Sequence, residues 1–274
     1  MGVDAQHRGL VMARRRTMVP WRQGLAGAFL MALLAGCVPS PAPQQATTPA
    51  ASASKTATEA AIRWKVLLVA ADDAEPVFDN GVDALKAKLE GFGVPAADIA
   101  VLKADAPRAE AAASQANFDR EAARLAGPAG TGCFVYITSH GARGYGLVAA
   151  RDEAVIPPAY LAQVLAVPCT GRPTVLVLSG CYSGIYTDTP ALATPDRIVL
   201  AAARADRPSF GCGADDRYTY YDECFLGALQ QGAAWTAIAA GTAACVARRE
   251  QSKGFPASAP QAAIGRNAAT LTAF

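Results

Sequence analysis

The chain has 274 residues and a formal net charge of only +2. Its lysines and arginines are scattered instead of gathered on one face, which excludes the electrostatic footprint of a nucleic-acid-binding protein. The length allows one large domain or two small ones, and since the first sixty or so residues do not look folded, we expect one domain of ordinary size.

The N-terminus has the pattern of a bacterial lipoprotein signal peptide. A basic stretch at residues 14–16 precedes an apolar stretch at 25–34, which is too short to anchor stably across a bilayer. It ends in Leu-Ala-Gly-Cys at residues 34–37, where small residues suit a signal peptidase and the Cys37 thiol accepts a diacylglyceryl group. We predict a signal peptide over residues 1–36 and lipidation of Cys37. An ordinary signal peptide with a chance cysteine is the alternative.

A flexible tether is expected after the lipidated cysteine. Residues 38–60 are mostly Pro, Ala, Ser, Thr and Gln, and such a segment cannot bury enough apolar surface to offset its conformational entropy. The predicted organisation is therefore a signal peptide, a tether over residues 37–62 and a globular domain over 63–274. Because Val38 stands where an inner-membrane retention signal would have Asp, we expect an outer-membrane lipoprotein facing the periplasm.

Strands and helices alternate along the globular part, which predicts an α/β fold with a mainly parallel sheet. Buried strands read as short apolar, β-branched runs bounded by Gly, Pro or polar residues. The helical stretches show apolar residues at helical spacing. The expected strands are residues 65–70, 98–102, 134–138, 174–178 and 197–202, with a short hairpin at 144–148 and a last strand near 263–265; the expected helices are 80–89, 114–125, 158–167, 221–232 and 233–248.

Chemistry-bearing residues follow two of these strands. His140 comes just after the run at 134–138, and Cys181 comes just after the run at 174–178. Ligands in open parallel sheets bind just past the carboxyl ends of the strands. Outside the leader, His140 is the only histidine, so any general base with a near-neutral pKa must be this residue. We therefore expect Cys181 to be a nucleophile assisted by His140.

Glycines around the pair fit acyl transfer. Gly141 lets the chain turn directly after the base, and the amides of Gly141 and Cys181 can point at a developing oxyanion. Gly180 would allow substrate backbone to approach the thiol closely.

Other interpretations use the same residues. A lone His at a strand end is often only hydrogen-bonded, and a Cys in an apolar strand is usually inert packing. A serine hydrolase using Ser183 would need Gly at position 181 and a second histidine. A catalytically inactive binding module, or a structural lipoprotein of the envelope, would share the leader and the tether.

The dyad resembles that of the legumain-like cysteine peptidases, family C13 of the caspase-like clan. Members carry His-Gly after one central strand and Cys after the next, as His140-Gly141 and Cys181 stand here. The segment 201–210 is similar to the family's Ala-rich strand and the Ser-containing wall of its specificity pocket, and 220–222 resembles the segment with its acidic pocket residue. The similarity covers roughly residues 64–245.

The resemblance implies a caspase-like three-layer α/β/α sandwich and a cysteine-type endopeptidase without a cofactor, acting on protein or peptide substrates. Cys181 would attack a peptide carbonyl and His140 would protonate the leaving amine. Because the family includes a transamidase, another amine could replace water in resolving the thioester. The substrate-binding residues implied are Asp79, Ser179, Ser209 and Asp222.

Two positions depart from the family pattern. Ser179 stands where legumains usually have Glu, and Asp79 stands where they have Arg in the loop after the first strand. With Asp79 and Asp222 both in the pocket, charge complementarity favours a basic residue before the scissile bond.

Five cysteines remain besides Cys37 and Cys181. A periplasmic location permits disulfides, and Cys212 and Cys224 flank a loop that a bridge between them would pin. Since five is an odd number, at least one thiol stays free. The sequence has no short-spaced Cys or His pairs of the kind that a zinc site needs, so no metal is expected.

Overall fold

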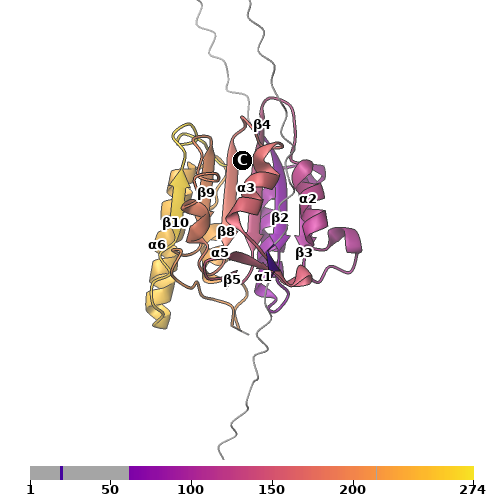
Figure 1. Cartoon of the computed structure of the whole chain (residues 1–274). Helices are drawn as coiled ribbons and strands as arrows, with labels where there is room; N and C mark the ends of the chain where they lie inside the picture. Colours follow the sequence, from indigo (N-terminus) through magenta and orange to yellow (C-terminus); the bar gives the residue numbers. More distant parts are fainter. Residues whose placement is uncertain (1–18, 21–61, 214) are drawn as a thin grey trace, which may run out of the picture.

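The computed structural model describes residues 19–20, 62–213 and 215–274. Its centre is a six-stranded sheet with the order β10-β9-β8-β4-β2-β3 (Figure 1). All neighbouring strands run parallel except β10, which pairs antiparallel with β9. The strands are β2 (Arg63–Ala70), β3 (Ile99–Lys103), β4 (Thr131–Thr138), β8 (Thr174–Ser179), β9 (Arg197–Ala201) and β10 (Gln261–Ile264).

Helices cover both faces of this sheet, so the predicted three-layer α/β/α sandwich is confirmed. α1 (Val77–Gly91), α5 (Tyr220–Ala228) and α6 (Trp235–Lys253) pack on one face. α2 (Gln115–Ala123) and α3 (Pro158–Ala166) pack on the other. Short helices complete the fold: α4 (Gly184–Thr187) and the 3₁₀ turns Ala96–Asp98, Ala109–Ala111 and Ala150–Asp152.

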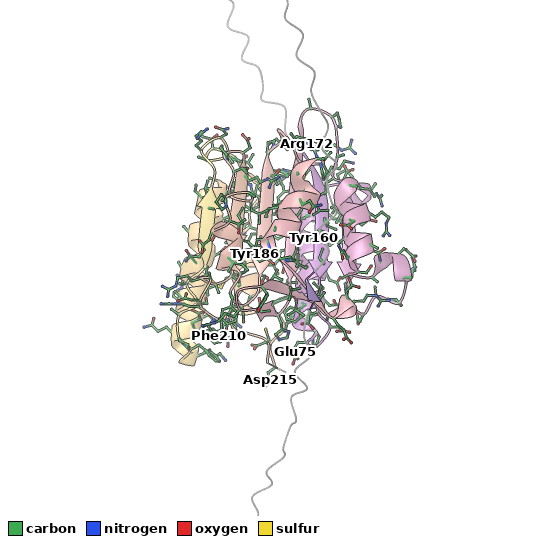
Figure 2. All side chains as sticks on the ribbon, in the orientation of Figure 1. Glu75, Tyr160, Arg172, Tyr186, Phe210 and Asp215 are labelled. Carbon is green, nitrogen blue, oxygen red and sulfur yellow. A yellow bond between two sulfur atoms is a disulfide. The ribbon has the colours of Figure 1, made fainter. Side chains whose placement is uncertain are left out.

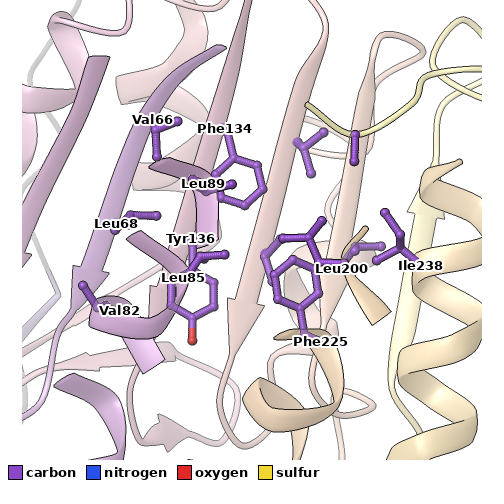
Figure 3. Close-up of a cluster of buried hydrophobic side chains, with 14 of the residues drawn as sticks. Val66, Leu68, Val82, Leu85, Leu89, Phe134, Tyr136, Leu200, Phe225 and Ile238 are labelled. Atoms are coloured by element: carbon purple, nitrogen blue, oxygen red, sulfur yellow. The ribbon is translucent and has the colours of Figure 1, made fainter. Parts of the chain in front are cut away.

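Alternate residues of each central strand supply the two cores. Val66, Phe134 and Tyr136 point to the face covered by α1 and α5, where they meet Leu85 and Phe225 (Figure 3). On the opposite face the neighbouring strand residues pack under α2 and α3. Burial on both faces explains why β4 and β8 read as continuous apolar runs, with every residue of each strand buried.

Local signals set the helix starts. Ser114 caps α2, since its side chain accepts a hydrogen bond from the amide of Asn117, and Thr219 caps α5 in the same way through the amide of Asp222. The helix α3 begins with proline at its first position, where no amide hydrogen is needed.

A second, small sheet extends the predicted hairpin. It has the order β1-β7-β6-β5, formed by β1 (Val19–Pro20), β5 (Gly141–Ala142), β6 (Gly146–Ala149) and β7 (Ala154–Ile156). β5 follows His140 directly, so this sheet holds the histidine loop. β1 falls within the segment predicted to be a signal peptide and pairs parallel with β7.

The two disulfides differ from the predicted one. Cys133 pairs with Cys169, and Cys224 pairs with Cys245, so the predicted Cys212–Cys224 bridge is wrong. Cys224 lies buried inside α5, and its sulfur is bonded to Cys245 of α6, so it cannot also bridge Cys212. Cys212 remains a free thiol, as does Cys181.

The lipid-anchor prediction concerns residues that the structure leaves undescribed. Cys37, the signal peptide apart from residues 19–20, and the tether up to residue 61 lie outside the described part. Within the described part, no helix combines the length and apolar character needed to cross a membrane.

Candidate active site

The two predicted catalytic residues, His140 and Cys181, lie the same number of positions after the ends of two adjacent strands. In the β4–β8 ladder, Thr138 is the register partner of Ser179, and the amide of Ser139 donates to the carbonyl of Ser179 at 3.0 Å. His140 and Cys181 each come two residues later. Parallel strands end at the same edge of a sheet, so the two loops leave the sheet side by side.

Glycine is required at two positions because these loops touch. A Cβ atom at Gly141 would lie 1.8 Å from the carbonyl oxygen of Cys181, which brings the backbone after the base against the backbone of the candidate nucleophile. A Cβ at Gly180 would lie 2.5 Å from both the Ser139 carbonyl oxygen and the Leu147 side chain. Gly180 is therefore needed for loop packing, and its role in admitting substrate backbone stays a prediction.

His140 is oriented by a buried carboxylate. Its Nδ1 lies 2.9 Å from Oδ2 of Asp72, which follows β2, the strand on the other side of β4. The amide of Ala74 donates to the second oxygen of Asp72 at 2.9 Å. Phe78 meets the imidazole edge-on with ring centroids 5.0 Å apart. With Nδ1 committed to Asp72, Nε2 is the nitrogen left for chemistry.

This pair shifts both ionisations toward the charged forms. The hydrogen bond to Asp72 raises the pKa of His140 above its ordinary value, although partial burial opposes it. Burial alone would raise the pKa of Asp72, but hydrogen bonds from His140 and the Ala74 amide outweigh burial and hold the pKa below its ordinary value. The imidazolium–carboxylate state is thereby favoured.

The sulfur of Cys181 lies against Ser209, in the segment that follows β9. The amide of Ser209 lies 3.2 Å from Sγ, its carbonyl oxygen 3.4 Å and its hydroxyl 3.7 Å. The amide of Tyr182 donates to the carbonyl of Arg207 at 2.8 Å, which holds the same segment beside the cysteine. An N–H aimed at the sulfur stabilises negative charge there. Ser209 is thus beside the candidate nucleophile, as expected.

The second free cysteine, Cys212, is kept as a thiol. Burial is the main cause that raises the pKa of Cys212 to about 12, and the acidic groups around it act in the same direction. At neutral pH it carries almost no thiolate, so it is a poor competitor for electrophiles.

Ser179 and Asp222 lie together in a buried polar group beneath the dyad. Asp222 has no exposed surface, and its Oδ2 accepts a 2.8 Å hydrogen bond from the hydroxyl of Thr138. The hydroxyls of Ser179 and Thr219 are 3.5 Å apart, and Oδ1 of Asp222 has no hydrogen-bond partner. Burial raises the pKa of Asp222, which favours its neutral form.

Asp79 lies elsewhere, in the first turn of α1, and is not brought together with this group. Its Oδ2 is 3.4 Å from Nζ of Lys103. Burial raises the pKa of Asp79 even though Lys103 opposes that shift. The hypothesis of a doubly acidic pocket is weakened, because Asp79 does not join Asp222 and its charge is offset by Lys103.

Ser183, the nucleophile of the serine-hydrolase alternative, is buried. Its Oγ accepts a hydrogen bond from the amide of Ala203 at 3.3 Å, and its side chain is only 1% exposed. A substrate carbonyl cannot reach this oxygen, which opposes that alternative.

Sequence reasoning missed Asp72. It is 68 residues from His140, and an acidic residue after a strand resembles an ordinary solvated turn. The available signal was its position at the carboxyl end of a strand next to the one that carries His140. Among the residues that the structure describes, no cluster of His, Cys, Asp and Glu is placed to hold a metal ion.

The sequence model of the peptidase C13 family matches residues 130–242, which include His140, Cys181 and Asp222. A search of curated proteins found no match. Among solved structures, the fold is similar to the crystal structure of caspase-1 from Spodoptera frugiperda, with a TM-score of 0.53, 13% sequence identity, and coverage of 74% of this chain and 86% of that one. The family match includes both loops of the candidate site, and the structural similarity shows the fold.

Proposed function

We propose that this chain, whose sequence match and fold support assignment to the legumain-like peptidase C13 family, is a cysteine endopeptidase working through His140 and Cys181. The observation that carries the proposal is the β4–β8 register, which sets the two residues at adjacent strand ends with Gly141 against Cys181. The substrate class is protein or peptide, and the mechanism needs no cofactor.

The reaction would begin with attack of the Cys181 sulfur on a peptide carbonyl carbon. The amides of Gly141 and Cys181 would stabilise the oxyanion. As the C–N bond breaks, Nε2 of the His140 imidazolium donates its proton to the leaving amine, and a thioester forms on Cys181. Neutral His140 then takes a proton from water as the water oxygen attacks the thioester, which releases the acid product and restores the thiolate–imidazolium pair.

Asp72 would act on His140 instead of on the substrate. Its carboxylate fixes the ring with Nδ1 toward itself and supports the imidazolium that donates the proton. The dyad thereby gains a positioning residue.

Of the predicted substrate-binding residues, Ser209 touches Sγ and is assigned to the residue before the scissile bond. Ser179 and Asp222 are buried below it, where they would shape the floor of that pocket without touching the substrate. Asp79 would influence substrate binding only through its negative charge, which the nearby Lys103 offsets.

Fluorogenic peptides with Lys, Arg, Asn or Asp before the cleavage site test the proposal. Wild-type protein should cleave at least one of them, and Cys181→Ala and His140→Ala should each reduce kcat/KM by about 10³-fold or more. Equal cleavage by wild type and Cys181→Ala would contradict it. Preference for Lys or Arg would support an acidic pocket, whereas cleavage only after Asn would exclude one.

Transamidation uses the same thioester. An added amine would attack in place of water, with His140 again accepting the proton. We propose hydrolysis as the main reaction, and mass spectrometry of products formed with and without glycine amide measures the partition.

We further propose that the domain is anchored to the bacterial envelope by lipid on Cys37 and faces the periplasm. The lipobox motif at residues 34–37 supports the anchor. The two disulfides support an oxidising compartment, because such bonds are rare in the reducing cytosol.

A further inference from the structure

Two stacked phenylalanines lie beside the candidate nucleophile. Phe210 follows Ser209, whose amide, carbonyl and hydroxyl surround Sγ of Cys181. Its ring stacks on that of Phe255, with centroids 4.5 Å apart and planes inclined by 26°. In the described part of the chain only Tyr145, Val167 and Phe255 are large hydrophobic residues with exposed side chains, and Phe255 is 43% exposed. Figure 2 shows Phe210 at the lower end of the molecule, where Glu75, from the loop after β2, also lies.

The Phe255 ring is held in this place from several sides. Gly254 ends α6 in the left-handed conformation with φ of 74°, and the amide of Phe255 donates to the carbonyl of Glu250 at 2.9 Å. Tyr220 meets the Phe255 ring edge-on at 5.9 Å. An aromatic face kept partly in water by a fixed backbone costs hydrophobic free energy, which binding of an apolar group would recover.

The segment that carries Phe255 is also tied to the wall beside Cys181. The amide of Arg204 donates to the carbonyl of Ser258 at 2.9 Å, and Nη1 of Arg207 donates to the carbonyl of Ala257 at 2.8 Å. Residues 254–258 and 204–210 therefore form one surface, which we call the aromatic wall.

Strand order decides which part of a substrate meets this wall. In the sequence β9-β8-β4, the nucleophile follows the middle strand, His140 follows β4 and the wall follows β9. His140 protonates the leaving amine, so the part of the peptide after the scissile bond must lie on the β4 side. The acyl part, before the scissile bond, then extends across the wall.

We infer that the aromatic wall is a binding subsite in which Phe210 and Phe255 receive an aromatic or large aliphatic side chain located two to four residues before the scissile bond. This inference rests on the proposed peptidase function and adds a substrate class to it. Successive residues of an extended peptide point to opposite sides. The wall therefore faces either the residue three positions before the scissile bond or the residues two and four positions before it.

Matched peptides test the subsite, each with Phe, Leu or Gly at one of the three positions and the best residue of the panel at the cleavage site. For wild-type protein, Phe or Leu at one position should raise kcat/KM by about tenfold over Gly. Phe255→Ala should abolish that preference, so that the Phe, Leu and Gly peptides are cleaved with similar kcat/KM. Val167→Ala, which removes another exposed apolar side chain at the C-terminal end of α3, should keep the full preference.

Two further measurements distinguish a failure of the subsite proposal from a failure of the peptidase proposal. Alkylation of Cys181 by iodoacetamide should proceed equally in wild type and Phe255→Ala, and Phe255→Leu, which keeps an apolar side chain, should retain most of the preference. A Phe255→Ala protein that cleaves peptides with the wild-type preference would overturn the subsite and leave the peptidase proposal standing. Wild-type protein that cleaves no peptide of the set would overturn both.

Discussion

At the scale of single residues, the chemistry depends on how His140 is held. Asp72 binds Nδ1, Phe78 packs against the ring, and Gly141 brings the following backbone against Cys181. Each of these contacts limits the orientation of an imidazole whose side chain is still 40% exposed and so open to substrate. A catalytic histidine needs this combination of restraint and access.

Asp72→Asn should show whether the carboxylate acts through His140. The amide keeps the shape but loses the charge, so the ionisation of His140 should move to lower pH and kcat should fall by about 10²-fold with little change in KM. The pH dependence of kcat/KM measures the shift. Asp73→Asn, on the exposed neighbouring carboxylate, is the matched control. An unshifted profile in Asp72→Asn would reduce Asp72 to a structural role.

The same pair should affect stability within a defined pH window. The pKa of Asp72 is lowered, so its contribution is present above the ordinary pKa of 3.8 and is lost as pH falls through the shifted value. The pKa of His140 is raised, so its contribution is complete below 6.5 and is lost as pH rises through the shifted value. Urea unfolding should therefore separate wild type from Asp72→Asn more at pH 5 than at pH 9. A constant difference would contradict this coupling.

Residues whose type carries its own chemistry at a strand end were the ones that the sequence could group together. His140, Cys181 and Ser209 were expected at one site, and the structure places their loops in contact. Asp72 was missed, and Asp79 was expected in the pocket although it pairs with Lys103. The role of a carboxylate depends on the residue it pairs with. When that residue is distant in the sequence, the packing of strands and helices determines the pairing, and the sequence alone does not show it.

At the scale of elements, strands and helices with a clear apolar period were predicted within a few residues. Strands of two to four residues are too short to show an alternation of apolar and polar side chains, which is why β5 and β7 were not identified as strands. The Cys212–Cys224 prediction failed because sequence spacing does not show which way a helical side chain faces; Cys224 faces α6.

The bond between Cys224 and Cys245 should stabilise the α5–α6 pair, which supports the aromatic wall from below through Tyr220. The two cysteines are 21 residues apart, and closing a loop of that size restricts the unfolded chain enough to stabilise the fold by about 3 kcal/mol. Cys245→Ala with Cys224→Ala should lower the free energy of unfolding by that order in urea. Cys212→Ala, which removes a free thiol, should change it far less.

At the scale of the whole molecule, residues 19–20 belong both to the predicted signal peptide and, as β1, to the small sheet of the domain. The proposed processing before Cys37 would remove β1 and leave the β7 edge of the small sheet without that neighbour. The three strands that hold the histidine loop, β5, β6 and β7, remain paired with each other. We therefore expect the processed form to be active.

Expression in a bacterial host tests the anchor. The mature N-terminus should be Cys37 carrying diacylglycerol, detectable by mass spectrometry, and the protein should fractionate with membranes. Cys37→Ala should abolish lipid labelling and release the domain to the soluble fraction, without changing peptide cleavage by the purified domain. A wild-type protein that retains residues 19–20 would rule out the predicted signal peptide.

The central claim is that Cys181 is a nucleophile assisted by His140, and an activity-based peptidyl acyloxymethyl ketone tests it most directly. The reagent should label one site, Cys181, since burial keeps Cys212 protonated. Cys181→Ala should not label, Cys212→Ala should label at the wild-type rate, and His140→Ala should label at least tenfold more slowly. Labelling of His140→Ala as fast as wild type would contradict the dyad.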